Sequence, residues 1–204
     1  METDRLVPAA WGTVVAALTL ACGPTGLAAV GVFLISLPWV LGTIGRRKAT
    51  LANVAPFLGA GMAVMAPVFK DQTLATVLEA TAVRSEVGPA MSWFEEWSRY
   101  SVLFEQTVDG SLARRFPMFV LLMCIGLTLW WLARGGERTK TAQRMMLIIG
   151  FSTFFLMFTP TKWTHHFGIY AGLGAAIAAY GSVVLSRIAL QLSLIHISEP
   201  TRRT

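Results

Sequence analysis

The residues best suited to chemistry lie in the stretch 159–167, which reads Thr-Pro-Thr-Lys-Trp-Thr-His-His-Phe. It places a lysine, a tryptophan and two of the three histidines between two long apolar runs, with no carboxylate beside them in the sequence. If Thr159 caps a helix that begins at Pro160, Lys162 falls in the first helical turn. Free N–H groups and the positive end of the helix dipole make such a turn an anion site. A lysine is unfavourable there alone, so the pattern predicts a bound phosphate or carboxylate.

Helical spacing assigns different roles to the side chains of this stretch. His165 and His166 lie three and four positions after Lys162, so one helix face can present all three side chains. Two histidines without a nearby acid or cysteine make a poor metal site, because metals usually need a third ligand. A phosphate or a sugar hydroxyl is the better partner. An imidazole hydrogen-bonded inside the protein fits one histidine equally well, and we favour His165 as the functional one.

The composition is that of a membrane protein. Apolar residues make up 54% of the chain and charged residues 14%, whereas a soluble domain has about 25% charged residues. Apolar runs near the roughly 20 residues that span a bilayer predict an all-α integral membrane protein with about six transmembrane helices. The expected spans are Pro8–Cys22, Gly26–Gly45, Leu51–Phe69, Phe116–Ala133, Met145–Phe158 and Phe167–Leu185. The two cysteines do not suggest a disulfide or a metal set.

The charges of the linkers predict the orientation. One set of alternate linkers holds nine cations and three acids, and the other set, with the segment 70–115, holds six cations and seven acids. The positive-inside rule places the basic set in the cytoplasm and the near-neutral set outside the plasma membrane. This distribution, and not nucleic-acid binding, accounts for the net charge of +6. The nine cations are Arg5, Arg46, Arg47, Lys48, Arg134, Arg138, Lys140, Arg144 and Arg187.

Two outer turns follow unusually short spans. Gly23-Pro24-Thr25-Gly26 and Thr159-Pro160-Thr161-Lys162 both carry a Pro-Thr pair. Each preceding span has about 15 residues and covers only about 22 Å. Short or Pro/Gly-interrupted spans are typical of a binding site set into the membrane. An ordinary turn with proline at a helix start remains the alternative, above all for the first of the two.

The outer segment 70–115 is too long and too polar for a turn. Asp71 is expected to cap a helix that ends at Gly88-Pro89. Arg114 and Arg115 close the segment just before a span, where they either anchor the chain at the interface or contact phosphate.

A second helix is expected in this segment, with an aromatic stripe. Trp93, Trp97, Tyr100 and Phe104 have the spacing of one helix face. Such a stripe most often lies at the level of the lipid headgroups, and a stacking platform for a sugar or a polyprenyl chain is the alternative.

Four motifs, GPTG, DQTLATVLEATAVR, TVDGSLARRF and FTPTKWTHHFG, closely resemble the cell-wall arabinosyltransferases of mycobacteria and their relatives, the Emb family. The resemblance extends from about Arg5 to Leu185. It implies a polytopic glycosyltransferase of the GT-C type. Such an enzyme transfers D-arabinofuranose from decaprenyl-phosphoryl-arabinose to cell-wall arabinan on the outer, periplasmic side of the plasma membrane. It requires no cofactor within this chain.

The resemblance also implies roles for individual residues. The turn that matches Lys162–His166 lines the pocket for donor and acceptor, and the position of His165 contacts ligand. The position of Gln72 is a site of drug-resistance changes. The family's general base is an aspartate in an earlier outer loop, so no catalytic residue is expected here. The predicted donor- and substrate-binding residues are Asp71, Gln72, Arg114, Arg115, Thr161, Lys162, Trp163, His165 and His166.

Measured against that family, residues 1–191 correspond to an internal part of the membrane domain. Residues 192–204 do not continue the family's sequence and are interpreted as a non-native tail. We therefore expect a fragment that is inactive by itself. Another glycosyltransferase that uses a polyprenyl-phosphate sugar is the main alternative, and a transporter segment is disfavoured because the spans are almost bare of polar residues. The acceptor polymer, the linkage and pairing with a paralogous subunit stay open.

Overall fold

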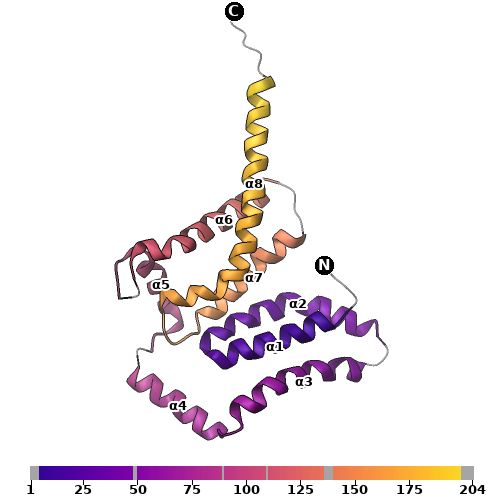
Figure 1. Cartoon of the computed structure of the whole chain (residues 1–204), viewed down its shortest axis with the longest axis vertical. Helices are drawn as coiled ribbons and strands as arrows, with labels where there is room; N and C mark the ends of the chain where they lie inside the picture. Colours follow the sequence, from indigo (N-terminus) through magenta and orange to yellow (C-terminus); the bar gives the residue numbers. More distant parts are fainter. Residues whose placement is uncertain (1–4, 48–49, 89, 109, 136–139, 199–204) are drawn as a thin grey trace, which may run out of the picture. The chain divides into compact units, whose positions relative to one another are not determined.

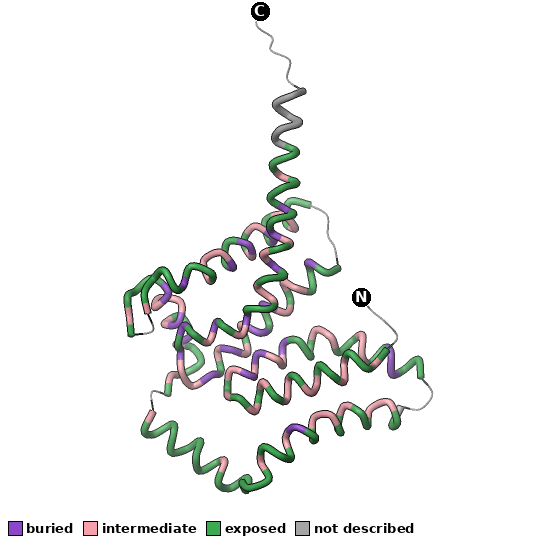
Figure 2. Tube along the Cα trace, viewed as in Figure 1, coloured by how far each residue is buried: buried purple, intermediate pink, exposed green. Residues whose placement is uncertain are grey.

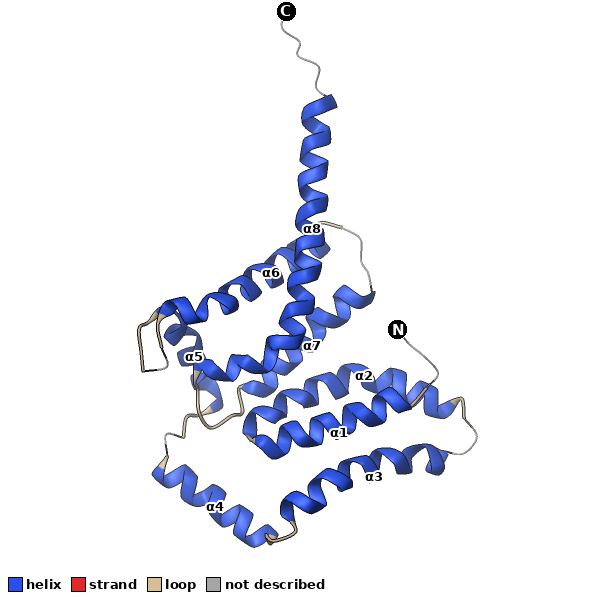
Figure 3. Cartoon of the chain, viewed as in Figure 1, coloured by secondary structure: helices blue, strands red, loops and turns tan. Residues whose placement is uncertain are grey.

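A computed structural model describes residues 5–47, 50–88, 90–108, 110–135 and 140–198. Over these residues the secondary structure is helical, with no β-strand (Figures 1 and 3). The all-α prediction is therefore confirmed. Some positions that enter the sequence-based predictions lie outside the described residues: Lys48, Pro89, Arg138 and the tail residues 199–204.

The chain divides into two compact units. The first comprises Met1–Val102 with Ile148–His166, and the second comprises Leu103–Leu147 with Phe167–Thr204. The first half of the chain contains α1 (Val7–Cys22), η1 (Pro24–Leu27), α2 (Ala28–Gly45), α3 (Thr50–Phe69), α4 (Leu74–Val87), η2 (Trp93–Glu96), α5 (Trp97–Ser101) and η3 (Val102–Phe104). The second half contains η4 (Leu112–Arg115), α6 (Phe116–Ala133), α7 (Lys140–Leu156), η5 (Thr164–Tyr170) and α8 (Ala171–Ser198).

Four helical stretches in the described part of the chain are long and apolar enough to cross a membrane: Pro24–Gly45, Leu51–Phe69, Leu112–Ala133 and Thr164–Gln191. Each contains or overlaps one predicted span. The two remaining predicted spans are helices of 16 and 17 residues, α1 and α7. These are the two spans that the sequence predicts to be short. α4, in contrast, is exposed along nearly its whole length (Figure 2).

Small residues let helices of the first unit approach closely. A Cβ atom on Gly31 of α2 would lie 2.7 Å from the backbone nitrogen of Ser152 in α7. The Ser152 hydroxyl donates a hydrogen bond of 2.9 Å to the carbonyl of Ala28. Glycine contacts and interhelical serine bonds are typical of membrane helix packing. Together they hold the end of α7, which carries the predicted site, against α2.

The turn after α1 also depends on glycine. Gly23 has φ 152°, and a Cβ atom on Gly26 would lie 2.4 Å from the Cα atom of Leu20. The residues between them form η1. The predicted turn is therefore a 3₁₀ turn folded tightly back on the end of α1.

In the second unit, α6 packs against α8. Cys124 is buried, and its Sγ lies 3.2 Å from the position that a Cβ atom on Gly181 would take. A Cβ atom on Gly174 would likewise lie 3.5 Å from the side chain of Leu121. Cys124 thus fills space between two helices, which is the packing role expected of it.

Candidate ligand-binding turn and the charge cluster behind it

The stretch from Met157 to Trp163 is a turn, and the next helical residue is Thr164. The predicted helix start at Thr159 and Pro160 is therefore wrong. The Thr159 hydroxyl, expected to cap that helix, instead donates to the carbonyl of Leu156 at 2.8 Å. It is 1% exposed and accepts a hydrogen bond of 2.7 Å from Arg99. An interaction with a distant segment has replaced the local cap.

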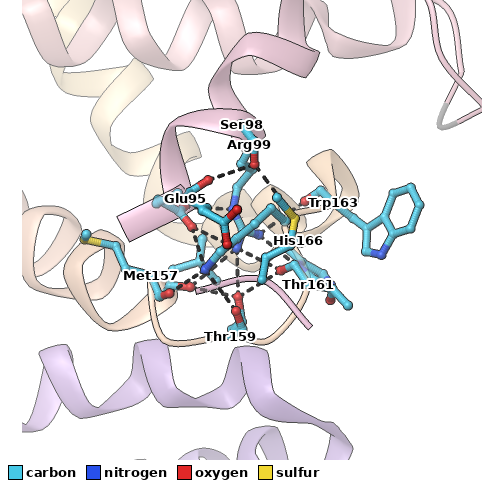
Figure 4. Close-up of polar contacts among 12 residues, drawn as sticks. Glu95, Ser98, Arg99, Met157, Thr159, Thr161, Trp163 and His166 are labelled. Atoms are coloured by element: carbon cyan, nitrogen blue, oxygen red, sulfur yellow. Dashed lines mark hydrogen bonds and ion pairs between the residues drawn. The ribbon is translucent and has the colours of Figure 1, made fainter. Parts of the chain in front are cut away.

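Arg99 of α5 is the centre of a buried network (Figure 4). Its side chain is 0% exposed and forms a bidentate pair with Glu96, with Nε–Oε1 at 2.8 Å and Nη2–Oε2 at 3.2 Å. The same guanidinium donates to the carbonyls of Thr161 and Trp163, each at 3.2 Å. A buried arginine is tolerated only when a carboxylate and further acceptors surround it. The 157–163 turn supplies those acceptors.

Lys162 points into this network and not toward a ligand. Its side chain is 1% exposed, and Nζ lies 3.3 Å from Oε2 of Glu96. It also donates to the carbonyls of Thr159, at 3.0 Å, and Met157. The prediction that Lys162 needs an outside anion is therefore wrong: Glu96, far away in the sequence, supplies the negative charge.

The two cations organise the end of α7 and the backbone that follows it. Arg99 and Lys162 together donate to five carbonyl groups of this stretch. The last carbonyls of a helix lack partners within the helix, and cations near its C-terminus are favourable. Met91 adds a backbone bond of 2.8 Å to the carbonyl of Pro160. The turn is thus fixed from inside. The five carbonyls are those of Leu156, Met157, Thr159, Thr161 and Trp163.

The two histidines have different surroundings. Nδ1 of His166 lies 2.8 Å from Nη1 of Arg99. Because arginine can only donate, Nδ1 must accept, and the ring proton is on Nε2. His165 is exposed and stacks on Trp163, with ring centroids 6.3 Å apart and an interplanar angle of 18°. His166 is therefore the internally bonded histidine, and His165 is the one presented outward.

The exposed surface of the turn is consequently a tryptophan–histidine pair. The indole of Trp163 points away from the polar network (Figure 4) and is 38% exposed. The rings of His165 and His166 form a T-shaped pair, with centroids 4.6 Å apart and an angle of 76°. The predicted common face of Lys162 with both histidines is wrong, because Lys162 is buried while His165 is exposed. Thr161 is half-buried and contributes its carbonyl to Arg99.

At the start of the outer segment, Asp71 does not cap a helix. Thr73 does: its hydroxyl accepts from the backbone N–H of Thr76, and the Thr76 hydroxyl receives the N–H of Thr73. In this capping box the Thr73 and Thr76 side chains satisfy both backbone N–H groups at the helix start, and Thr73 lies nearer to that start than Asp71 does. Asp71 is exposed and 3.9 Å from Lys70, and Gln72 is exposed as well. Both remain candidates only through the family resemblance.

The aromatic segment is helical from 93 to 104 but not a regular α-helix. It runs as η2, α5 and η3. Trp93 and Trp97 are 56% and 68% exposed, whereas Tyr100 is half-buried. Burial raises the pKa of the Tyr100 phenol, and the neighbouring Glu96 carboxylate raises this pKa further. The predicted stripe is therefore interrupted at Tyr100.

The arginine pair before α6 also divides into two roles. Arg115 is buried and donates to the carbonyls of Glu105 and Gly110 and, at 2.7 Å, to the hydroxyl of Thr107. It holds together the small loop in which Thr107 and Gly110 form an isolated bridge. Arg114 is exposed. Of the two, Arg114 alone keeps an outward position suited to a phosphate.

Sequence reasoning missed Glu96 and Arg99. The only signal was an acid and a base three positions apart in the aromatic segment, a spacing that is common on exposed helices. Among the residues that the structure describes, no three of His, Cys, Asp and Glu come together in a way that would hold a metal ion.

Comparison with known proteins identifies similar sequences and a similar structure. The family model described as "Mycobacterial cell wall arabinan synthesis protein" matches residues 1–195. The probable arabinosyltransferase B of Mycobacterium tuberculosis H37Rv is 44% identical over 95% of this chain and 18% of its own length. The probable arabinosyltransferase C of Mycolicibacterium smegmatis is 40% identical over 94% of this chain and 18% of its own length.

The structural match is to a cryo-EM structure of arabinosyltransferase EmbB from Mycobacterium smegmatis. It has a TM-score of 0.68 and 37% identity, and covers 89% of this chain and 16% of that chain. The chain thus spans less than a fifth of the length of these relatives. The family match includes 192–195, the first residues of the predicted tail, and α8 continues to Ser198.

Proposed function

Since the chain belongs to the family of mycobacterial cell wall arabinan synthesis proteins, we propose that it forms part of a membrane arabinosyltransferase. The enzyme transfers D-arabinofuranose from decaprenyl-phosphoryl-arabinose to an arabinan acceptor. The identity of 44% with an arabinosyltransferase B supports this activity. The basic linkers favour an active face outside the plasma membrane.

The observation that carries the proposal is the exposed pair of Trp163 and His165. An indole face packs well against the C–H face of a sugar ring, and an imidazole edge hydrogen-bonds to its hydroxyls. The stacked rings present both groups side by side, on a turn within one of the four motifs that resemble the family. We assign these two residues to the sugar of donor or acceptor.

The structure changes the role proposed for Lys162. Its charge is directed at Glu96 and at backbone carbonyls, so it shapes the turn and does not contact the phosphate. Stabilising the phosphate that leaves the sugar requires a cation or N–H groups aimed at the developing charge. A phosphate contact by Arg114, which is exposed, is proposed from the sequence alone.

A chimeric enzyme tests this function. In the arabinosyltransferase B of Mycolicibacterium smegmatis, which is 43% identical over 94% of this chain, the matching segment is replaced by residues 5–191 of this chain. Transfer from labelled decaprenyl-phosphoryl-arabinose to an arabinan oligosaccharide is then measured. We expect transfer by the chimera, and at least a tenfold loss in His165→Ala because a sugar contact is removed.

The matched control is Glu79→Ala, at an exposed position of α4, which should retain full transfer. A chimera that reaches the membrane in folded form but transfers no arabinose would contradict the proposed function. Full transfer by a folded His165→Ala variant would contradict the site.

A further inference from the structure

The buried network around Arg99 has no part in the chemistry assigned to the exposed rings. Arg99 is completely buried, so it cannot touch a substrate. Nonetheless, a network of two cations and one carboxylate is costly to desolvate, and an apolar cluster of the same volume would stabilise the fold as well or better. Stability alone therefore does not explain the network.

The geometry connects Arg99 to the exposed rings in two ways. First, its guanidinium donates to the carbonyl of Trp163 at 3.2 Å, which fixes the backbone that carries the indole. Second, it binds Nδ1 of His166 at 2.8 Å, and the rings of His165 and His166 form a T-shaped pair. Arg99 is thus linked to Trp163 through the Trp163 carbonyl, and to His165 through the His166 ring.

We propose that Arg99 is a positioning residue of the transferase, which holds Trp163 and His165 in the arrangement that binds the sugar. This step rests on the proposed function, although the network itself does not. Glu96 and Lys162 complete the buried network. The Glu96 carboxylate orients the guanidinium, and Lys162 donates to the carbonyls of Thr159 and Met157 beside it.

Lysine could not replace Arg99. The planar guanidinium offers five N–H donors in a fixed fork. Here that fork meets two carboxylate oxygens, the Thr159 hydroxyl, the His166 ring and several carbonyls. An ammonium group has three donors and no fixed plane, so Arg99→Lys keeps the charge but loses the orientation. Small displacements of positioned groups can cost up to about a hundredfold in rate.

The test is a double-mutant cycle in the chimera, with kcat/KM measured per folded molecule. We expect Arg99→Lys to lower kcat/KM at least tenfold, while Arg84→Lys, at an exposed position of α4, leaves it unchanged. If Arg99 acts through the exposed pair, Arg99→Lys should cost less than twofold more in a background in which Trp163 and His165 are both alanine. If the fold losses in kcat/KM from the separate substitutions multiply in the combined variant, the proposal is overturned. Normal activity of Arg99→Lys would overturn it as well.

A milder variant covers the case in which Arg99→Lys does not fold. Thr159→Val removes only the hydroxyl that accepts from Arg99 at 2.7 Å. We expect a loss of about threefold in kcat/KM, a magnitude typical of one lost hydrogen bond of modest strength. This loss should also vanish when Trp163 and His165 are both alanine. A Thr159→Val variant that folds and is fully active would count against the positioning role.

A spectroscopic readout separates this inference from the proposed function. With ¹⁵N-labelled histidine, His166 should show the neutral form protonated on Nε2 in the chimera and a mixture of forms in Arg99→Lys. This measurement does not depend on transfer. An inactive chimera with the expected His166 signal would refute the function and keep the network, whereas an active chimera with an unchanged His166 signal in Arg99→Lys would refute the inference.

Discussion

Glu96→Gln is the sharpest perturbation of the network. Glu96 is 5% exposed, and its carboxylate contacts both Arg99 and Lys162. Three charged contacts are affected: 2.8 Å and 3.2 Å to Arg99, and 3.3 Å to Lys162. Glutamine preserves the shape, but it removes the negative charge that contacts both buried cations. It also turns an N–H₂ group toward donors on at least one side.

The expected cost follows from that loss. Removing one partner of a buried ion pair typically costs about 3–5 kcal/mol. This free energy should appear in the opening of the 157–163 turn, because Lys162 and Arg99 bind its carbonyls. A change of about 1.4 kcal/mol is tenfold in an equilibrium constant, so amide exchange limited by this opening should accelerate roughly a hundred- to several-thousand-fold.

Hydrogen–deuterium exchange with mass spectrometry of the chimera measures this acceleration. The informative amides are Met91, which donates to the Pro160 carbonyl, and His166, which donates to the Trp163 carbonyl. Glu79→Gln makes the same chemical change at an exposed position of α4 and should alter exchange less than twofold. Exchange of the 157–163 turn that is equal in Glu96→Gln and Glu79→Gln would refute the account of the buried network.

Further predictions concern the packing, the loop before α6 and the alkaline limit. Gly31→Ala should destabilise the protein by about 1–3 kcal/mol through overpacking against the backbone of α7, visible as a lower Tm, whereas Gly59→Ala, with nothing within 4 Å, should not. Arg115→Ala should increase proteolysis of the loop that it holds, and Arg114→Ala should not. The raised pKa of Tyr100 gives stability that is complete below the unfolded pKa of about 10 and is lost as pH rises through the folded pKa. Tyr100→Phe should lack that alkaline loss in melts recorded from pH 8 to 11.

The helices at the predicted spans could be predicted from the sequence because their signal is local. Run lengths and apolar content alone located the helices, and even the shortness of α1 and α7 was visible as a count of residues. Of the two histidines, the one favoured as functional, His165, is exposed, and His166 is internally bonded; the functional role of His165 stays a prediction.

The surroundings of Lys162 could not be predicted in the same way. Local rules placed it in a helical turn and left its charge unmatched. Its partner, Glu96, comes from a distant segment, and only the folded chain brings the two together. The same holds for Thr159, whose capping role disappears because Arg99 claims its hydroxyl. Long-range pairing of buried charges leaves almost no trace in one sequence.

Competitive labelling of the folded chimera tests the central claim most directly. Diethylpyrocarbonate modifies accessible histidines and an amine-reactive ester modifies accessible lysines, and tandem mass spectrometry locates each product. The account predicts rapid modification of His165, protection of His165 by decaprenyl-phosphoryl-arabinose, and no modification of Lys162. Rapid labelling of Lys162 that the donor suppresses, with His165 unaffected by the donor, would contradict it and restore an anion site at the lysine.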